Sequence, residues 1–281
     1  MKIGLSMWSV HQRWFDGSWG VRDFIHFCEA IPSLQGVELL SMFWRDRETE
    51  IPMVLKLLEE TQLAIASYSA SNNFATGDPQ EWSRQVKEVE DAVRTADRLG
   101  ARVVRVFSGD LKGDASFDRA RAQIVDGLRR AAACAKEYGV LLCLENHGLL
   151  AGKAEQVKGI IQDVGSDALR STFDTGNFLL VDENPVHSLS ILSGLIGHVH
   201  FKDFKKADAH SEGRTYRSLS GDPYIGAVSG KGDIDFGRIL AGLRQMRYSG
   251  WLSVEFEGEG DPLEGSRESV QALAKWLATD G

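Results

Sequence analysis

A short stretch in the second half of the chain, HVHFKDF at residues 198–204, alternates titratable and apolar side chains. Successive side chains of a strand point to opposite faces, so His198, His200 and Lys202 share one face and the apolar residues between them share the other. The stretch therefore predicts a strand with one apolar face and one face that carries three titratable groups. The rest of the sequence indicates the fold to which this strand belongs and a function for its titratable face.

Short apolar runs like this one alternate with longer amphipathic stretches along the whole chain. We predict strands at residues 2–6, 36–40, 63–69, 101–107, 140–146, 171–175, 198–203 and 251–257. A helix is expected after each strand, at residues 19–30, 50–60, 79–98, 114–138, 153–164, 184–195, 235–248 and 262–278. Eight strand–helix units in 281 residues have the size and rhythm of an α/β protein of the (β/α)8 TIM barrel type. No linker-like segment divides the chain, so we expect a single domain over residues 1–281.

Composition limits where the protein works and what it binds. The chain has 43% hydrophobic and 26% charged residues, no export signal, and no apolar run near the length of a membrane span. Its three scattered cysteines predict neither a disulfide framework nor a zinc cluster and fit a reducing cytoplasm. A net charge of −8 without a basic patch argues against nucleic-acid and membrane partners. We expect a cytoplasmic protein with a small-molecule ligand and leave open whether it forms a homo-oligomer.

Two connections between expected strands and helices, residues 7–20 and 203–233, are unusually long. Long connections in compact domains are usually functional. The first holds Trp8, Trp14 and Trp19, which could stack on a sugar or pack in the core. The second is rich in glycine and serine, and its basic residues include Lys205, Lys206, Arg214 and Arg217. Both connections follow strands, so in a barrel both would lie over the active-site face, and we expect 203–233 to roof the pocket.

Potential metal ligands end four consecutive predicted strands. They are Glu145 in LENHG, Asp174 in FDTGN, His200 in HVHFKD and Glu255 in VEFEG. Parallel strands of a barrel end at one mouth, so these side chains should converge, and carboxylates facing one another there would repel strongly without a cation. Three carboxylates and one imidazole suit Mn²⁺, Mg²⁺ or Co²⁺, with Zn²⁺ as a further option. A lone acid at a strand end is usually a solvated charge, but four ligands in register reverse that expectation.

The order of these motifs resembles the sugar phosphate isomerase/epimerase family of xylose isomerase-like TIM barrels, over nearly the whole chain. Further motifs that fit the family are GVELL at residues 36–40, SNNFA at 71–75 and GKGDIDF at 230–236. The resemblance implies that one divalent ion, Mn²⁺ first, is held by Glu145, Asp174, His200 and Glu255. It also implies that Glu145 and Glu255 flank the substrate carbon as acid and base.

Substrate contacts should differ from those of the ketohexose 3-epimerases of this family. Where those enzymes carry a histidine and a substrate-binding glutamate, this chain has Asn177 and Ala151, which argues against a simple free-ketohexose epimerase. His147 and Lys202 lie on the faces that bear the ligands, so His147 is a further candidate acid or base. Lys202 suits a polar group of the substrate, or a salt bridge to a neighbouring acid. The candidate substrate-binding residues are Lys202, His198, Asn177 and Asn146, and His198 suits equally a hydrogen bond behind the ligands.

These residues fit chemistry on a small ketose or keto-polyol. A divalent ion chelated by a ketone and its neighbouring hydroxyl stabilises the enediolate that forms as the intervening proton leaves, and two carboxylates can take and return that proton. The main hypothesis is therefore an isomerase or epimerase. The alternative is a dehydratase or lyase of the inosose or dehydroshikimate type, or one acting on 3-keto sugars. Endonuclease IV shares the barrel but needs more histidines, and a non-catalytic sugar-binding or assembly subunit would not need the complete ligand set.

Overall fold

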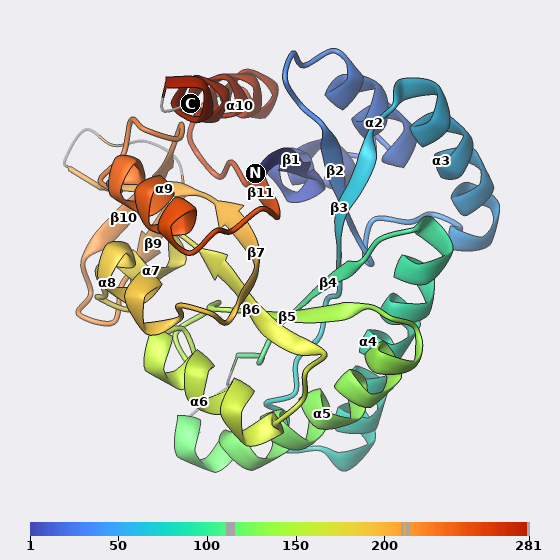
Figure 1. Ribbon diagram of the computed structural model, residues 1–281, viewed down its shortest axis with the longest axis vertical. Helices are drawn as coiled ribbons and strands as arrows, with labels where there is room; N and C mark the ends of the chain where they lie inside the picture. The colour runs from blue at the N-terminus through green and yellow to red at the C-terminus, as the bar shows by residue number, and fades with distance from the viewer. Residues whose placement is uncertain (111–115, 209–210, 212–213, 280–281) are drawn as a thin grey trace.

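The computed structural model describes residues 1–110, 116–208, 211 and 214–279, and in them eight parallel strands close into a barrel (Figure 1). These strands are β1 (Lys2–Ser6), β2 (Gly36–Leu40), β3 (Ala64–Ser69), β4 (Val103–Val106), β5 (Leu141–Glu145), β6 (Leu169–Asp174), β7 (Ile196–Phe201) and β11 (Trp251–Val254). Neighbouring strands follow chain order, and β11 closes the barrel between β7 and β1. The predicted TIM barrel is confirmed, with each strand overlapping its expected range.

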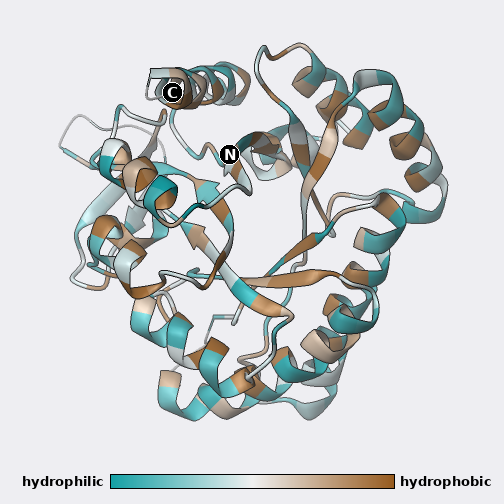
Figure 2. Ribbon diagram, in the orientation of Figure 1, coloured by the Kyte–Doolittle hydropathy of each residue, from teal (hydrophilic) through white to brown (hydrophobic). Residues whose placement is uncertain are grey.

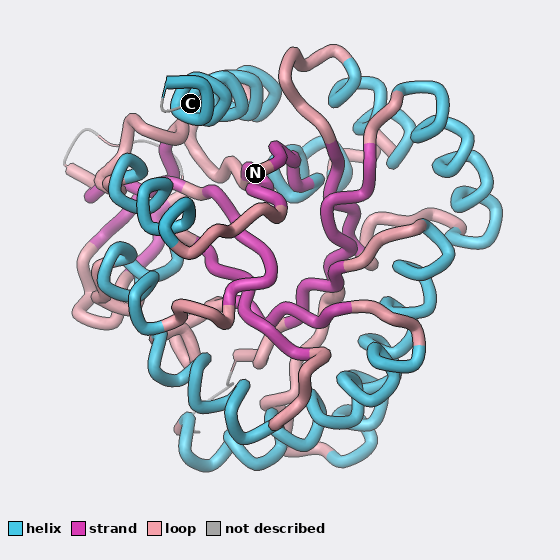
Figure 3. The backbone as a smooth tube through the Cα atoms, viewed as in Figure 1, coloured by secondary structure: helices cyan, strands magenta, loops and turns pink. Residues whose placement is uncertain are grey.

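Helices surround the barrel on all sides (Figure 3). They are α2 (Val21–Glu29), α3 (Arg47–Thr61), α4 (Pro79–Leu99), α5 (Phe117–Glu137), α6 (Ala154–Val164), α8 (Pro185–Ile191), α9 (Phe236–Gln245) and α10 (Pro262–Thr279). Shorter helices within the connections are η1 (Met7–Val10), α1 (His11–Phe15) and α7 (Asn177–Leu180). Helix α3 begins earlier than expected because Asp46 caps it, accepting a hydrogen bond from the N–H of Glu48. The expected start of the fourth helix, residues 114 and 115 of the range 114–138, lies outside the described residues.

Apolar side chains fill the space between barrel and helices. Figure 2 shows hydrophobic residues gathered along the strands and on many of the helix faces turned toward them. Every residue of β2 is buried, as expected of a parallel strand covered on both sides. Within the part of the chain that the structure describes, no helix is long and apolar enough to cross a membrane. The packed wall holds the strand ends in fixed positions.

The register of the strands brings the predicted ligands to one end of the barrel. Asp174 on β6 lies opposite His200 on β7, and His200 lies opposite Ser253 on β11. Glu255 follows β11 directly after Val254, and its backbone N–H donates to the carbonyl of Phe201 at the end of β7. The last residue of β5 is itself Glu145. Carboxyl-terminal strand ends therefore carry all four side chains to the same mouth.

The long connection between β7 and α9 folds into a second, antiparallel sheet, which we call the lid. Its strands are β8 (Asp203–Lys206), β9 (Thr215–Arg217) and β10 (Pro223–Ala227), in the order β8-β10-β9. Strand β10 approaches the end of β11 so closely that a Cβ on Gly226 would lie 2.1 Å from the carbonyl oxygen of Glu257. Glycine is needed there because any side chain would push the lid off the barrel.

Candidate metal centre and active-site cavity

The four side chains at the strand ends lie together. One ligand atom from each of Glu145, Asp174, His200 and Glu255 lies within 4.8 Å of the others, and all four residues are buried. His200 Nδ1 lies 3.5 Å from Glu145 Oε2, 3.8 Å from Asp174 Oδ2 and 3.7 Å from Glu255 Oε2. One oxygen from each of three carboxylates thus lies near the same imidazole nitrogen, Nδ1 of His200.

Several atoms of this cluster have no hydrogen-bond partner, although buried polar atoms are rarely left without one. Glu145 Oε2, Asp174 Oδ2 and His200 Nδ1 are all in this state. The other oxygen of Asp174, Oδ1, accepts the backbone N–H groups of Gly176 and Asn177, each at 2.8 Å, which aims Oδ2 at the cluster. Ligands that bind one divalent ion at about 2.0–2.2 Å lie about 3–4 Å from one another. The donor set and its spacing therefore fit a single divalent ion.

A buried ammonium partly balances the carboxylates. Lys202 Nζ lies 2.5 Å from Glu255 Oε2, 3.2 Å from Asp174 Oδ2 and 3.1 Å from Glu257 Oε1. Burial alone would lower the pKa of Lys202, but these carboxylates outweigh it and raise that pKa well above its usual range. Burial, together with the charges of Glu145 and Glu255, raises the pKa of Asp174 to about 7 despite Lys202. One ammonium does not neutralise this much buried negative charge.

Arg105 on β4 faces Glu145, a pairing that the sequence analysis did not predict. Its Nε lies 3.1 Å from Glu145 Oε2, the side chains are 4% and 2% exposed, and its Nη1 donates to the carbonyl of Ala70. The Nδ2 of Asn177 donates to the other oxygen of Glu145, at 3.0 Å. Burial opposes ionisation of Glu145, but the neighbouring side chains of His200 and Arg105 outweigh it and lower its pKa. Glu145 is therefore held as a fixed carboxylate.

A cavity of about 460 Å³ opens above the cluster. Glu145, Glu255 and Lys202 line it, as does His147, whose ring centroid lies 4.2 Å from that of Phe107. The cavity thus gives a small molecule access to both glutamates, to an ammonium and to an imidazole. Of the predicted substrate-binding residues, Lys202 reaches this space.

Two predicted substrate-binding residues, Asn146 and Asn177, lie behind the cluster. The Oδ1 of Asn146 accepts the backbone N–H of Asp174 at 2.8 Å, and its Nδ2 donates to the carbonyl of Asp174 at 3.0 Å. Asn177 contacts Glu145 as described above. Neither asparagine is among the residues that line the cavity. Asn177 thus holds a carboxylate of the cluster directly, whereas Asn146 holds the backbone of Asp174.

The lid reaches the cavity through Arg214 and Tyr216, so the described part of 203–233 agrees with the expectation that this connection lies over the pocket, and residues 209, 210, 212 and 213 lie outside the described residues. Lys205, Lys206 and Arg217 are exposed and are not among the lining residues. The guanidinium of Arg214 lies 4.8 Å from the ring centroid of Tyr216. One basic side chain of the lid therefore faces the cavity.

Glu257, which the sequence analysis did not single out, joins the lid to the barrel. Its Oε1 accepts hydrogen bonds from Trp8 Nε1 at 2.8 Å and Lys202 Nζ at 3.1 Å, and its Oε2 accepts one from the hydroxyl of Tyr216. Trp8 also lines the cavity, whereas Trp14 packs against the hydrophobic core. The signal in the sequence was spacing, since Glu257 follows Glu255 by two residues in VEFEG.

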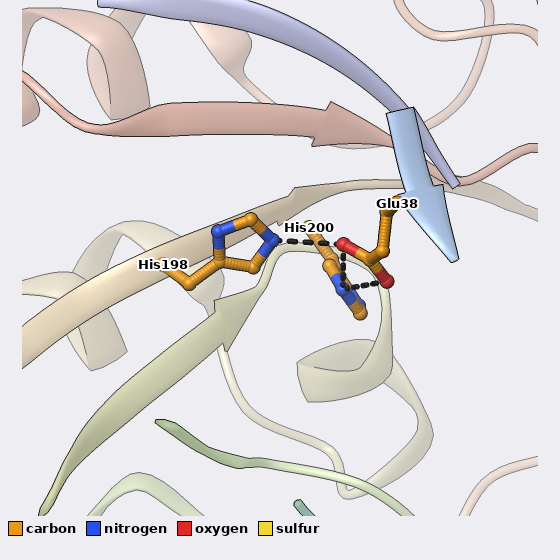
Figure 4. A group of neighbouring side chains, drawn as sticks. All are labelled: Glu38, His198 and His200. Atoms are coloured by element: carbon orange, nitrogen blue, oxygen red, sulfur yellow. Dashed lines mark hydrogen bonds and ion pairs between the residues drawn. The ribbon is translucent and has the colours of Figure 1, made fainter. Parts of the chain in front are cut away.

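His198 is fully buried and lies deeper than the cluster, in contact with Glu38 on β2 (Figure 4). Nε2 of His198 lies 2.9 Å from Glu38 Oε2, and Nε2 of His200 lies 3.0 Å from Glu38 Oε1. Neither His198 nor Glu38 lines the cavity. Glu38 was missed in the sequence, although an acid in the middle of the buried stretch GVELL is itself unusual.

The barrel and the strand-end cluster define a class, the (β/α)8 barrels with a candidate single-metal centre under a lidded cavity. Within that class, the chain belongs to the xylose isomerase-like TIM barrel family, which it matches over residues 29–277.

Relatives and solved structures agree with this assignment. The inosose dehydratase of Clostridium perfringens (strain ATCC 13124) is 26% identical over 253 residues, which are 84% of this chain and 83% of the relative. The crystal structure of a D-tagatose 3-epimerase-like protein has a TM-score of 0.78 at 21% identity, covering 99% of this chain and 97% of that one. The structure of an IOLI protein with a binding zinc atom has a TM-score of 0.74 at 18% identity, covering 99% and 96%. The two solved structures share the fold of this chain.

Proposed function

We propose that this protein is a metal-dependent dehydratase of a small cyclic keto-polyol of the inosose type. The similarity to an inosose dehydratase over most of both chains supports this alternative above the isomerase or epimerase of the main hypothesis. The observation that carries the proposal is the pairing of a base with a proton donor at the cavity wall, where Glu255 Oε2 lies 2.5 Å from Lys202 Nζ. Elimination of water needs both groups.

The reaction removes a proton from the carbon beside the ketone and the hydroxyl from the next carbon. The electrons of the C–H bond form the new C=C bond, the C–O bond breaks, and the hydroxyl leaves with an added proton as water. In this proposal Glu255 accepts the first proton and the ammonium of Lys202 supplies the second, and their mutual contact supports this division of roles. His147 lines the same cavity and is the alternative proton donor.

Glu145, Asp174, His200 and Glu255 would hold the divalent ion, and their oxygen-rich set suits Mn²⁺, Mg²⁺ or Co²⁺, with Zn²⁺ as a further option. When bound, such an ion polarises the ketone oxygen and so lowers the cost of removing the neighbouring proton. Arginine cannot exchange protons at ordinary pH, so Arg105 keeps its neighbour Glu145 in the charged form. Glu145 then serves as a ligand more readily than as a proton carrier.

Mass spectrometry separates this proposal from its rival. The purified protein is loaded in turn with Mn²⁺, Co²⁺, Mg²⁺ and Zn²⁺ and incubated in deuterated buffer with an inosose and with ketohexoses. We expect the inosose to lose one water. Deuterium uptake by any of these compounds without loss of water would contradict the dehydratase and support an epimerase or isomerase. An Asp174→Asn variant, which lacks one charged ligand, serves as the matched control and should form little product.

An epimerase or isomerase is the second candidate, because Glu145 and Glu255 both line the cavity. Two carboxylates could remove a proton from one face of a substrate carbon and return it from the other. Against this stand the contacts of Asn177, at the position where the ketohexose 3-epimerases carry a histidine. It is turned to Glu145 and does not line the cavity.

A further inference from the structure

We propose that Glu38 is a positioning residue that keeps the ring proton of His200 on Nε2 and thereby leaves Nδ1 free to bind the metal ion. The inference rests on the proposed metal centre but not on the reaction catalysed there. Glu38 belongs to β2, which is not a neighbour of β7 in the barrel, so the two side chains meet across its interior. Figure 4 shows both imidazole rings joined by dashed lines to the carboxylate of Glu38.

The position of the proton follows from the partners of each ring nitrogen. Nε2 of His200 lies 3.0 Å and 3.2 Å from the two oxygens of Glu38. A carboxylate can only accept hydrogen bonds, so Nε2 must carry a proton, and a neutral imidazole then has a lone pair on Nδ1. That lone pair has no hydrogen-bond partner and faces the carboxylates of Glu145, Asp174 and Glu255. An arrangement of lone pairs around one point suits a bound cation.

Other contacts fix the carboxylate of Glu38 in place. Nε2 of His198 lies 2.9 Å from Oε2, and the hydroxyl of Ser69 donates to Oε1 at 2.9 Å. Both oxygens of Glu38 therefore accept hydrogen bonds, and the side chains of Glu38, His198 and His200 are all 0% exposed. Because the carboxylate cannot rotate without losing these bonds, it also fixes the plane of the His200 ring.

This arrangement gives Ser69→Ala as a matched control. That variant removes one donor to the same carboxylate and leaves both histidines in contact with it. Glu38→Gln has nearly the same shape as the natural residue but has lost the charge and one acceptor oxygen. Loss of a carboxylate behind a ligating histidine typically weakens metal binding by about 10- to 100-fold.

The test uses the full chain and two readouts that do not depend on activity. Calorimetric titration with Mn²⁺ is expected to give one ion per chain, a dissociation constant about 10- to 100-fold higher for Glu38→Gln, and a smaller rise for Ser69→Ala, which keeps the charge of Glu38 and both of its histidine contacts. Nitrogen-15 NMR of histidine-labelled natural protein, free of metal and at a pH where His200 is neutral, should show a proton on its Nε2. This second readout needs no variant to fold.

Each contrary result has its own meaning. Equal affinity of the natural protein and Glu38→Gln, or a His200 proton found on Nδ1 in the neutral ring, overturns the role of Glu38. Two ions per chain, of which Glu38→Gln loses one, would make Glu38 a ligand and also overturn it. Failure of the natural protein to bind any ion overturns the metal centre itself, and the proposed function with it.

Discussion

Lys202 occupies an unusual position for a single side chain, because its ammonium contacts carboxylates of Asp174, Glu255 and Glu257 at the wall of the cavity. Buried ion pairs of this kind rarely add much stability, since the cost of desolvating the charges offsets their attraction. In the proposed reaction their contribution is to hold a protonated donor beside a carboxylate base. Lys202 is for this reason the residue whose replacement should affect the chemistry most selectively.

We expect Lys202→Gln to lower kcat for dehydration by about 100- to 10,000-fold, because an amide cannot supply a proton to a leaving hydroxyl. His147→Ala, which alters the same cavity, should lower kcat by much less. Steady-state rates measured together with bound metal per chain check this, since loss of the ion would imitate loss of the acid. Near-complete loss in His147→Ala with the metal retained, alongside an active Lys202→Gln, would assign the acid to the histidine.

The sequence alone indicated the residues that end strands but not those that support them. Glu145, Asp174, His200 and Glu255 could be predicted because each ends a strand, and all parallel strand ends meet at one mouth. The partners Glu38 and Arg105 lie within strands. The contact of Glu38 with His200 depends on which strands face each other after the barrel closes, and that of Arg105 with Glu145 depends on the register of two neighbouring strands. An ionisable residue inside an apolar stretch was the signal available at both positions.

At the scale of elements, the lid depends on a close approach of β10 to the barrel. Gly226 forms an isolated bridge with Gly258, next to the carboxylate of Glu257 that binds Tyr216 of the lid. The sequence predicted a long functional connection here but not its sheet. The three strands are only 4, 3 and 5 residues long, too short for periodicity to reveal them.

Gly226→Ala should displace the lid, because the new Cβ would lie 2.1 Å from the carbonyl oxygen of Glu257. We expect the free energy of unfolding to fall by about 1–3 kcal/mol and KM to rise. Gly77→Ala is the matched control, since nothing lies within 4 Å of its added Cβ. Urea unfolding and steady-state kinetics measure both effects. Equal behaviour of the two variants would show that the lid does not depend on this contact.

Asp203 at the start of β8 makes the stability of the lid region depend on pH. Its Oδ2 accepts the N–H groups of Gly230 and Gly232 at 2.8 Å and 2.9 Å, yet burial outweighs these bonds and raises its pKa to about 6. The unfolded chain has a pKa of about 3.9 at this residue. The folded state thus binds the proton more tightly, and this contribution to stability is lost as pH rises through about 6.

Asp203→Asn should remove this dependence, because an amide keeps one accepting oxygen and does not titrate. Between pH of about 4 and 7, the natural protein should lose up to about 2–3 kcal/mol of unfolding free energy relative to the variant. Urea unfolding of both proteins across that range measures the difference. Parallel curves for the two proteins would show that Asp203 titrates alike in the folded and unfolded states.

At the scale of the whole molecule, two arcs of the barrel wall supply different parts of the site. One arc carries the candidate ligands, and the other carries residues that contact those ligands. Strands β5, β6, β7 and β11 are consecutive neighbours, and the candidate ligands belong to them or follow them directly. The other arc supplies Glu38 from β2, which contacts His200 across the interior, and Arg105 from β4, which contacts Glu145 on the neighbouring strand β5. The eight-unit rhythm predicted this barrel, but contacts across it could be seen only in three dimensions.

The most direct test of the account is a crystal structure of the protein grown with Mn²⁺, with anomalous scattering used to locate the ion. We expect one ion per chain, at about 2.0–2.3 Å from atoms of Glu145, Asp174, His200 and Glu255. His200 should bind through Nδ1 while its Nε2 remains hydrogen-bonded to Glu38. A cluster without an ion at saturating Mn²⁺, or an ion held instead by Glu38 and His198, would contradict the account.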